Sequence, residues 1–272
     1  MKTSLTVSRL WIHPVKGCRA IAIDTAEIDA LGLAGDRRFL IIDRHGKGLT
    51  QRSHPQMALI ATGLDPETLV LQTEKQGRLV VPRHVDEARI LRVQVWGDHD
   101  LAAEDCGPEA SSWVSAALGT SARLVRIGRS YRRPVEANGA DHVSFTDAYP
   151  LLVITEASLS ALNERLVDRR EYPVPMERFR PNLVIAGAVP HAEDRWTNLM
   201  IGDVALRPTT PCARCTVITV DQATGTRLHE PLRTLATYRR DPANLHHVNF
   251  GRNVINTSKR GSISVGQTVI AT

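Results

Sequence analysis

The stretch PCARCTVITVD spans residues 211–221 and decides how the rest of this chain is interpreted. Its second half, residues 216–220, alternates β-branched side chains and predicts a β-strand. Cys212, Arg214 and Cys215 come directly before that strand. A cysteine is a nucleophile and a soft metal ligand only as the thiolate, which a neighbouring cation stabilises. Paired cysteines near a strand are also often small buried apolar residues, so these residues alone leave chemistry and packing equally open.

The composition predicts an ordinary globular protein of one large or two modest domains. The chain has 272 residues, 42% of them hydrophobic and 23% charged, and a net charge of +5. This mild positive charge suits a pocket for an anionic small molecule or an acidic partner protein. No Lys/Arg block or aromatic pattern indicates nucleic-acid binding, so we expect no nucleic-acid partner.

The chain carries no sign of secretion or of a membrane span. Its four cysteines are too few and too unevenly spaced for a disulfide framework. The start, Met1 to Val7, lacks the apolar run of a secretory signal, and no segment approaches the roughly 20 apolar residues of a membrane helix. We therefore expect a cytoplasmic protein with no membrane partner.

Residues 1 to about 98 read as short strands separated by turns, which predicts a small antiparallel barrel or sandwich. The expected strands are residues 21–28, 39–42, 69–71, 79–81 and 90–96.

The remainder keeps strands but adds helices. Helical spacing predicts a helix over residues 107–119, and Thr155 is positioned to cap a second helix that runs to about Leu166. Residues 128–141 are rich in arginine and predict an exposed loop. Gly202-Asp203 and Gly266 mark expected hairpin turns. The expected strands are residues 124–127, 151–154, 183–186, 200–206, 216–220 and 262–270. We predict a mainly β (α+β) chain with two or three helices.

Cationic motifs recur where the expected strands begin. Lys16 and Gly17 lie in HPVKGC, residues 13–18, where a glycine allows close backbone approach to a ligand and a lysine can face a phosphate. For Lys16 alone, a solvated turn lysine is the commoner case. Arg37 precedes the strand at Phe39, and Arg52 follows one hairpin later. Lys16, Arg37 and Arg52 are candidates to converge on one polyanionic group.

Two further motifs carry hydrogen-bonding groups. Thr146 and Asp147 lie in SFTDAYP, residues 144–150, and suit recognition of a polar heterocycle, although an aspartate before a strand often only caps a turn. Arg180 and Asn182 flank Pro181, and a guanidinium and an amide there can read the donor and acceptor pattern of a ring. A loop-anchoring arginine is the structural alternative.

Taken together, these motifs resemble the MOSC family. HPVKG, DRRF, TDAYP, FRPN and PCARC…VD…TG occur in the order and spacing of that family over most of the chain, from about Arg9 to about Val269. The resemblance is closest to the group that holds the mitochondrial amidoxime-reducing components and their bacterial relatives. It implies an N-terminal β-barrel domain, residues 1–120, ahead of a MOSC β-barrel domain, residues 121–272.

The resemblance also implies a cofactor, molybdenum bound to molybdopterin (Moco), between the two domains. Cys215 would ligate molybdenum and be the catalytic residue, while Cys212 would be a packing residue. Ala213 stands where some relatives have a hydroxyl, and Gly17 stands where related sequences have a serine. The other cofactor-binding residues would be Lys16 and Arg37 at the phosphate, Thr146, Asp147, Arg180 and Asn182 at the pterin, and Gly17 and Arg214 beside them.

The function implied is reduction of N-hydroxylated compounds such as hydroxylaminopurines, amidoximes and hydroxylamines. The chain has no cysteine after Cys215, so we expect electrons from a separate flavin or iron–sulfur protein. His13, His54, His142 and His247 are equal candidates for proton delivery. A carrier or sulfuration protein for the cofactor is the alternative function, and a non-catalytic storage module is a third.

Overall fold

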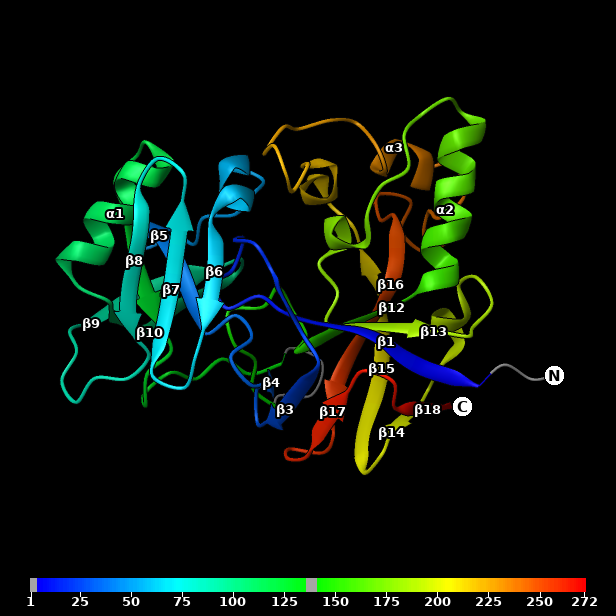
Figure 1. Ribbon diagram of the computed structural model, residues 1–272, viewed down its shortest axis with the longest axis horizontal. Coiled ribbons are helices and arrows are strands. Elements are labelled where there is room, and N and C mark those ends of the chain that lie inside the picture. Colours follow the sequence, from blue (N-terminus) through cyan, green and yellow to red (C-terminus); the bar gives the residue numbers. More distant parts are fainter. Residues whose placement is uncertain (1–3, 136–140) are drawn as a thin grey trace.

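The computed structural model describes residues 4–135 and 141–272, which form two units that lie side by side (Figure 1). The larger unit contains, within the described residues, a closed barrel of seven strands. All neighbouring strands in it are antiparallel except β12 and β13. Around the barrel the strands are β1 (Leu5–Ile12), β13 (Leu183–Ala186), β12 (Leu151–Thr155), β16 (Asn249–Asn256), β15 (Val204–Ala213), β14 (Leu199–Ile201) and β18 (Thr268–Ala271), which pairs with β1 again.

The smaller unit is built from two antiparallel sheets and one helix that share a core. One sheet has the order β5 (Phe39–Asp43), β11 (Ala122–Arg126), β10 (Asp98–Asp105) and β9 (Ile90–Val95), and the other is β6 (Ala61–Leu64), β7 (Thr68–Thr73) and β8 (Gly77–Pro82). Phe39, Leu69 and Val114 contribute to this core. Short strands that belong with the larger unit are β2 (Ile21–Ile23), which pairs with β1, and β17 (Ser262–Ser264), β3 (Thr25–Asp29) and β4 (Gly32–Leu33), which pair in that order and contribute to the barrel core.

The two units exchange strands. β1 comes first in the chain, yet it closes the barrel by pairing Leu10 with Leu183 and Leu5 with Val269. Conversely, β11 follows residue 121 and pairs with β5 of the smaller unit. The domain boundary between residues 120 and 121 stays a prediction, and in space each unit takes one strand from across that boundary.

The described residues contain three α-helices: α1 (Pro108–Leu118), α2 (Glu156–Asp168) and the short α3 (Leu232–Leu235). The predicted number was two or three, and the predicted positions match α1 and α2, whereas α3 was not located from the sequence. α1 ends at Gly119, whose φ of 65° is the left-handed conformation that glycine adopts easily. α2 begins at Thr155, whose side chain accepts a hydrogen bond from the backbone N–H of Ser158. Single-turn 3-10 helices are η1 (Pro55–Leu59), η2 (Met176–Phe179), η3 (Ala192–Arg195) and η4 (Thr216–Thr219).

The predicted strand over residues 216–220 is wrong, because this stretch forms η4. Its β-branched residues face the core on a tight turn: Ile218 and Val220 are buried, and the Thr219 hydroxyl donates to the Thr216 carbonyl oxygen. Arg178 also donates to the Thr219 carbonyl oxygen. These tertiary contacts outweigh the local β-propensity. Cys212 consequently lies at the end of a strand, β15, and Cys215 follows that strand, instead of both preceding one.

Two loop predictions also need correction. The segment 128–141 is not simply exposed, since Tyr131, Arg133 and Val135 are buried; its Asn138-Gly139 pair lies outside the described residues. The turn at Gly266 does not join a hairpin, because β17 pairs with β3 whereas β18 pairs with β1 and β14. The turn at Gly202 does join paired strands, β14 and β15.

No helix within the described residues is long and apolar enough to cross a membrane.

Replacing Leu10 by alanine tests the role of β1. Leu10 is 1% exposed and packs in the barrel core, so Leu10→Ala should lower the free energy of unfolding by about 2–5 kcal/mol. Urea unfolding monitored by circular dichroism measures this loss. Val189→Ala is the control, because Val189 is 61% exposed and its loss should change stability by less than about 0.5 kcal/mol. Similar small effects of both changes would contradict the closing role of β1.

Candidate active site

One large cavity lies where the two units meet, and every predicted cofactor-binding residue lines it. It encloses about 890 Å³, part of which is open to solvent. The loop after β1 contributes Lys16 and Gly17, and the loop before β5 contributes Arg37. The segment before β12 supplies Thr146 and Asp147, and the segment between η2 and β13 supplies Arg180 and Asn182. Arg214 and Cys215 enter from the end of β15. The structure therefore brings all the predicted residues together, while their individual roles stay predictions.

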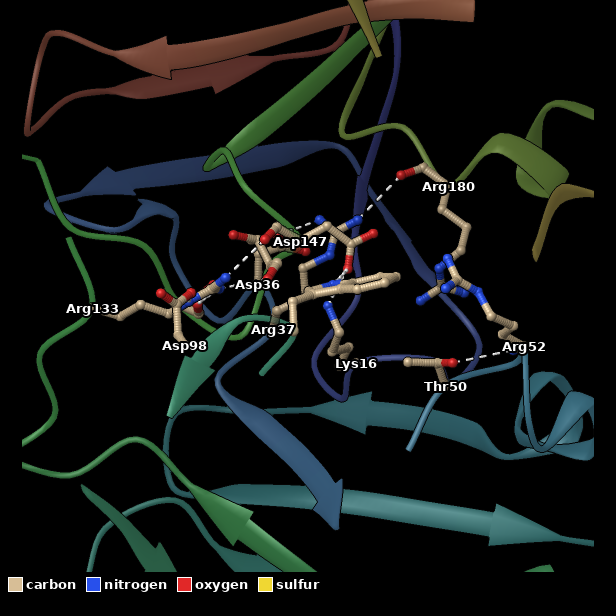
Figure 2. A network of polar contacts seen from close by, with 12 residues as sticks. Lys16, Asp36, Arg37, Thr50, Arg52, Asp98, Arg133, Asp147 and Arg180 are labelled. Carbon is tan, nitrogen blue, oxygen red and sulfur yellow. Dashed lines mark hydrogen bonds and ion pairs between the residues drawn. The ribbon is translucent and has the colours of Figure 1, made fainter. Parts of the chain in front are cut away.

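Three buried or half-buried cations, Lys16, Arg37 and Arg180, meet in this cavity. Figure 2 shows them around Asp147, with Arg180 approaching from the opposite side to Arg133. Burial lowers the pKa of Arg180 to about 10, and the nearby charge of Arg37 adds to this effect. Burial also lowers the pKa of Lys16, against the attraction of Asp147. Gathering like charges away from water is unfavourable unless an anion joins them.

Asp147 is the present counter-charge at the centre of this group. Its carboxylate accepts from the Lys16 ammonium and, at 2.8 Å, from the Trp96 indole N–H. Although desolvation acts to raise it, the pKa of Asp147 is lowered by the charge and hydrogen bond of Lys16 and by the hydrogen bond of Trp96. The side chain is nevertheless 68% exposed, because it faces the open cavity. Asp147 is thus an ionised group directed at the space where a ligand would lie.

Arg37 and Asn182 are held by the protein on several sides. Arg37 forms an ion pair with buried Asp36 and donates to the Asn182 side-chain oxygen at 3.1 Å and to the Arg180 carbonyl oxygen at 3.2 Å. Asn182 is fully buried; its oxygen also accepts from the Leu152 N–H, and its amide donates to the Trp11 carbonyl oxygen at 3.2 Å. Asn182 therefore positions Arg37, and a direct contact with a ligand stays a prediction for it.

Arg180 and Thr146 keep unused hydrogen-bonding capacity. Arg180 donates from Nη1 to the Cys18 carbonyl oxygen at 2.8 Å, but its buried Nη2 has no partner within the described chain. The buried Thr146 Oγ1 likewise has no partner among the described residues. Buried polar atoms in native proteins normally have hydrogen-bond partners, so two such atoms without partners in one cavity indicate a polar ligand.

Gly17 serves the site through its backbone. Its φ of 85° is in the left-handed region, and a Cβ there would lie 2.7 Å from the Met57 methyl carbon. Its carbonyl oxygen accepts from the Gln51 amide at 2.7 Å.

Both cysteines of the decisive motif reach the cavity, with different surroundings. Arg214 donates from Nη1 to the Cys212 sulfur at 2.9 Å and from Nη2 to the Phe179 carbonyl oxygen at 2.7 Å. Cys212 also packs against a hydrophobic cluster, as expected for a packing residue. Cys215 is half-buried at the start of η4, with no recorded hydrogen bond to its sulfur in the described residues. Arg214 therefore contacts the other cysteine, and Cys215 as the metal ligand stays a prediction from the family motif.

The structure adds residues that the sequence did not single out. Trp96 lines the cavity, and the guanidinium of Arg52 stacks over its ring at 4.5 Å from the centroid. Arg52 therefore does reach this cavity with Lys16 and Arg37. Asn253 of β16 is a further lining residue. Trp96 ends the expected strand over residues 90–96, but nothing in that pattern showed that it points toward the site.

Arg133 is the second missed residue, and it supports the site from behind. It is 3% exposed and donates to the carbonyl oxygens of Thr146 at 2.6 Å and Asp147 at 2.8 Å, and it pairs with Asp98 at 2.7 Å. Its guanidinium thereby holds the Thr146–Asp147 backbone in place. This role was not predicted, because the segment that contains Arg133 was expected to be an exposed loop.

None of the four histidines proposed as proton donors lines the cavity. His13 comes nearest in sequence, but burial, followed by the charges of Arg180 and Arg37, lowers its pKa well below the ordinary value. Among the described residues, no group of three or more His, Cys, Asp or Glu side chains is arranged to hold a metal ion.

Comparison with known proteins decides the family. Residues 4–121 match the MOSC N-terminal beta barrel domain, and residues 140–270 match the MOSC domain. Mitochondrial amidoxime-reducing component 1 of Mus musculus is 38% identical over 86% of this chain and 71% of its own length. The chain belongs to the MOSC family of the amidoxime-reducing components.

Other relatives within and near this MOSC family agree. Mitochondrial amidoxime-reducing component 1 of Homo sapiens is 36% identical over 88% of this chain and 73% of its own length. Molybdenum cofactor sulfurase of Danio rerio is 32% identical over 98% of this chain, which corresponds to 34% of that protein. Among solved structures, the YUAD protein from Bacillus subtilis aligns with 98% of this chain and 94% of its own at a TM-score of 0.39 and 9% identity, too low to bear on function.

Arg133→Met tests whether this side chain holds the site of the MOSC protein together. The change leaves the carbonyl oxygens of Ser144, Thr146 and Asp147 without their charged donor, so the free energy of unfolding should fall by about 2–4 kcal/mol. Urea unfolding measures the loss. Arg129→Met is the matched control, because Arg129 is exposed in the same segment. Equal stability of the two variants would show that Arg133 is dispensable.

Proposed function

We propose that this protein is a molybdenum-cofactor-dependent reductase of N-hydroxylated compounds. One observation carries the proposal: a single cavity gathers the Cys215 thiol, three cations and two unpartnered buried polar atoms, in a chain similar to amidoxime-reducing components. The substrates would be small molecules with an N–OH group, such as amidoximes, hydroxylamines and hydroxylaminopurines.

The lining residues fit molybdopterin chemically. Lys16 and Arg37 offer charge to a phosphate, and Arg180 Nη2 and Thr146 Oγ1 are unused groups for the polar ring system. A thiolate such as that of Cys215 is a good ligand for a soft metal. When bound, the cofactor supplies two-electron redox chemistry at molybdenum. Gly17, Asp147, Asn182 and Arg214 complete the set of residues that would surround it.

The overall reaction breaks the N–O bond of the substrate. An N–OH group, two electrons and two protons give N–H and one molecule of water. Electrons would come from a separate flavin or iron–sulfur protein, and the net charge of +5 suits docking of an acidic partner. The chain itself would ligate the metal, orient the substrate and screen both from bulk water. Asp147 and Lys16 are polar groups available at the cavity.

A second function is favoured by one specific similarity. The match to molybdenum cofactor sulfurase covers 98% of this chain, which suits a carrier or sulfuration protein in which Cys215 would hold sulfur or cofactor transiently. The chain corresponds to 34% of that relative, so most of the relative's length lies beyond the matched region. Reductive turnover distinguishes the two functions.

A cytoplasmic location is also part of the proposal. All four cysteines are free, and Cys215 must stay reduced to act as a ligand. A reducing compartment meets that requirement.

Substituting each cysteine in turn tests the ligand assignment. Cys215→Ser should lower reduction of a model amidoxime on the order of a hundredfold or more and change the absorption spectrum of the bound molybdenum, since the metal loses its protein ligand. Cys212→Ser should retain substantial activity, because its sulfur only packs and accepts from Arg214. The reverse pattern would assign the metal to Cys212.

Comparing two cations tests the phosphate site apart from folding. Lys16→Met removes a charge whose recorded partner is the exposed Asp147 carboxylate, so molybdopterin content should fall while the apo-protein loses at most about 1 kcal/mol. Arg37→Met leaves the buried Asp36 carboxylate without its ion-pair partner, so both cofactor content and stability should fall. Molybdenum and pterin content and apo-protein melting are the measurements. Parallel losses in Lys16→Met would give Lys16 a structural role.

A further inference from the structure

A second cleft, of about 750 Å³ with open solvent included, adjoins the cofactor cavity on the side of the smaller unit. It shares Lys16, Thr50, Arg52 and Trp96 with that cavity. Its remaining lining residues do not line the cofactor cavity: Lys47, Gly48 and Ser53 after β5, and Gln94 and Val95 at the end of β9. The two spaces therefore meet along a wall made by Arg52 and Trp96.

The second cleft is positively charged. Lys16, Lys47 and Arg52 line it, and no carboxylate is among its lining residues. Asp147 offsets Lys16, whereas no ion pair is recorded for Lys47 or Arg52 in the described chain. Asp43, four residues before Lys47, is held by the backbone N–H groups of His45 and Lys47. The hydroxyls of Thr50 and Ser53 add hydrogen-bonding groups to the same wall.

Trp96 is held at this wall against its backbone preference. Val95 and Asp98 are paired, so Trp96 and Gly97 form the turn between β9 and β10. Trp96, not the glycine, takes the left-handed conformation, with a φ of 56°. A large side chain with positive φ is uncommon and unfavourable, which marks a constrained and often functional position. Its carbonyl oxygen accepts from the Gln94 amide at 2.8 Å, and its ring carries Arg52 on one face and donates to Asp147.

We propose that this cleft binds the phosphate of a phosphomonoester substrate whose N-hydroxylated end enters the cofactor cavity past Trp96. The proposal rests on the reductase function above. A phosphomonoester carries up to two negative charges and three acceptor oxygens, which match the cations and hydroxyls of the cleft. The phosphate of the cofactor offers the same chemistry, but Lys47 lines only the second cleft and so separates the two sources. The selected substrates are N-hydroxylated nucleotides in preference to their nucleosides.

Lys47→Glu tests this subsite in the cofactor-loaded protein. Calorimetry with adenosine and adenosine 5′-monophosphate measures binding, and steady-state kinetics with N6-hydroxyadenosine and its 5′-monophosphate measures KM. In the unaltered protein the monophosphate should bind about tenfold more tightly than the nucleoside, and Lys47→Glu should remove this preference, in Kd and in KM alike. High salt should also weaken the preference. Lys75→Glu is the matched control, because Lys75 is an exposed lysine in the β7–β8 turn outside both spaces.

The remaining outcomes decide against the subsite in distinct ways. Equal affinity of the unaltered protein for nucleoside and monophosphate overturns it. Loss of molybdopterin from Lys47→Glu also overturns it, and would assign the cleft to the cofactor phosphate. Turnover of benzamidoxime, which has no phosphate, is measured in parallel. Its absence in molybdenum-loaded protein contradicts the reductase function, whereas the calorimetric preference still reports on the phosphate subsite by itself.

Discussion

The hydrogen bonding of β1 to both β13 and β18 is the constraint on which the rest of the structure depends. A barrel lacking that strand would expose two edges, which need partners in any sheet protein. Because the first strand of the chain closes the second unit, the loop that follows it must run along the junction (Figure 1). That loop carries Lys16 and Gly17, and the Lys16 N–H donates to the Phe39 carbonyl oxygen of the smaller unit at 3.0 Å. Barrel closure and site formation are therefore one event.

The cavity concentrates features that folding alone disfavours. Lys16, Arg37 and Arg180 bring like charges together out of water, which lowers the pKa values of Lys16 and Arg180. Arg37, Arg180 and Trp96 have φ values of 50°, 55° and 56°, which non-glycine residues seldom adopt. Arg180 Nη2 and Thr146 Oγ1 also lack partners in the described chain. A bound polyanion would relieve the repulsion and satisfy these atoms, so the costs point to ligand binding and not to stability.

The features that could be predicted from the sequence are those that depend on residues close together in the chain, such as the ends of helices. The helix that begins after Thr155 follows from its capping hydroxyl, and the helix ending at Gly119 follows from the glycine. The turn at residues 216–219 could not be predicted, because only tertiary contacts such as that of Arg178 favour it over a strand. The cofactor motif was recognisable as a set. The burial of Arg133 was not, since most of its partners are backbone carbonyl oxygens, which no pattern of side chains reveals, and its one carboxylate partner, Asp98, is distant in sequence.

The residues proposed for the reaction and those proposed for substrate selection come from different parts of the structure. Cys215 and Arg180 come from segments next to barrel strands, which hold reacting groups in fixed positions. Lys47 comes from a loop of the smaller unit and lines only the second cleft, whereas Arg52 and Trp96, also from loops of that unit, form the wall between the two spaces. Loops tolerate change far better than the strands that they join. Because Lys47 lines only the second cleft, a substitution there would alter which N-hydroxylated compound is accepted while leaving the cofactor's surroundings intact.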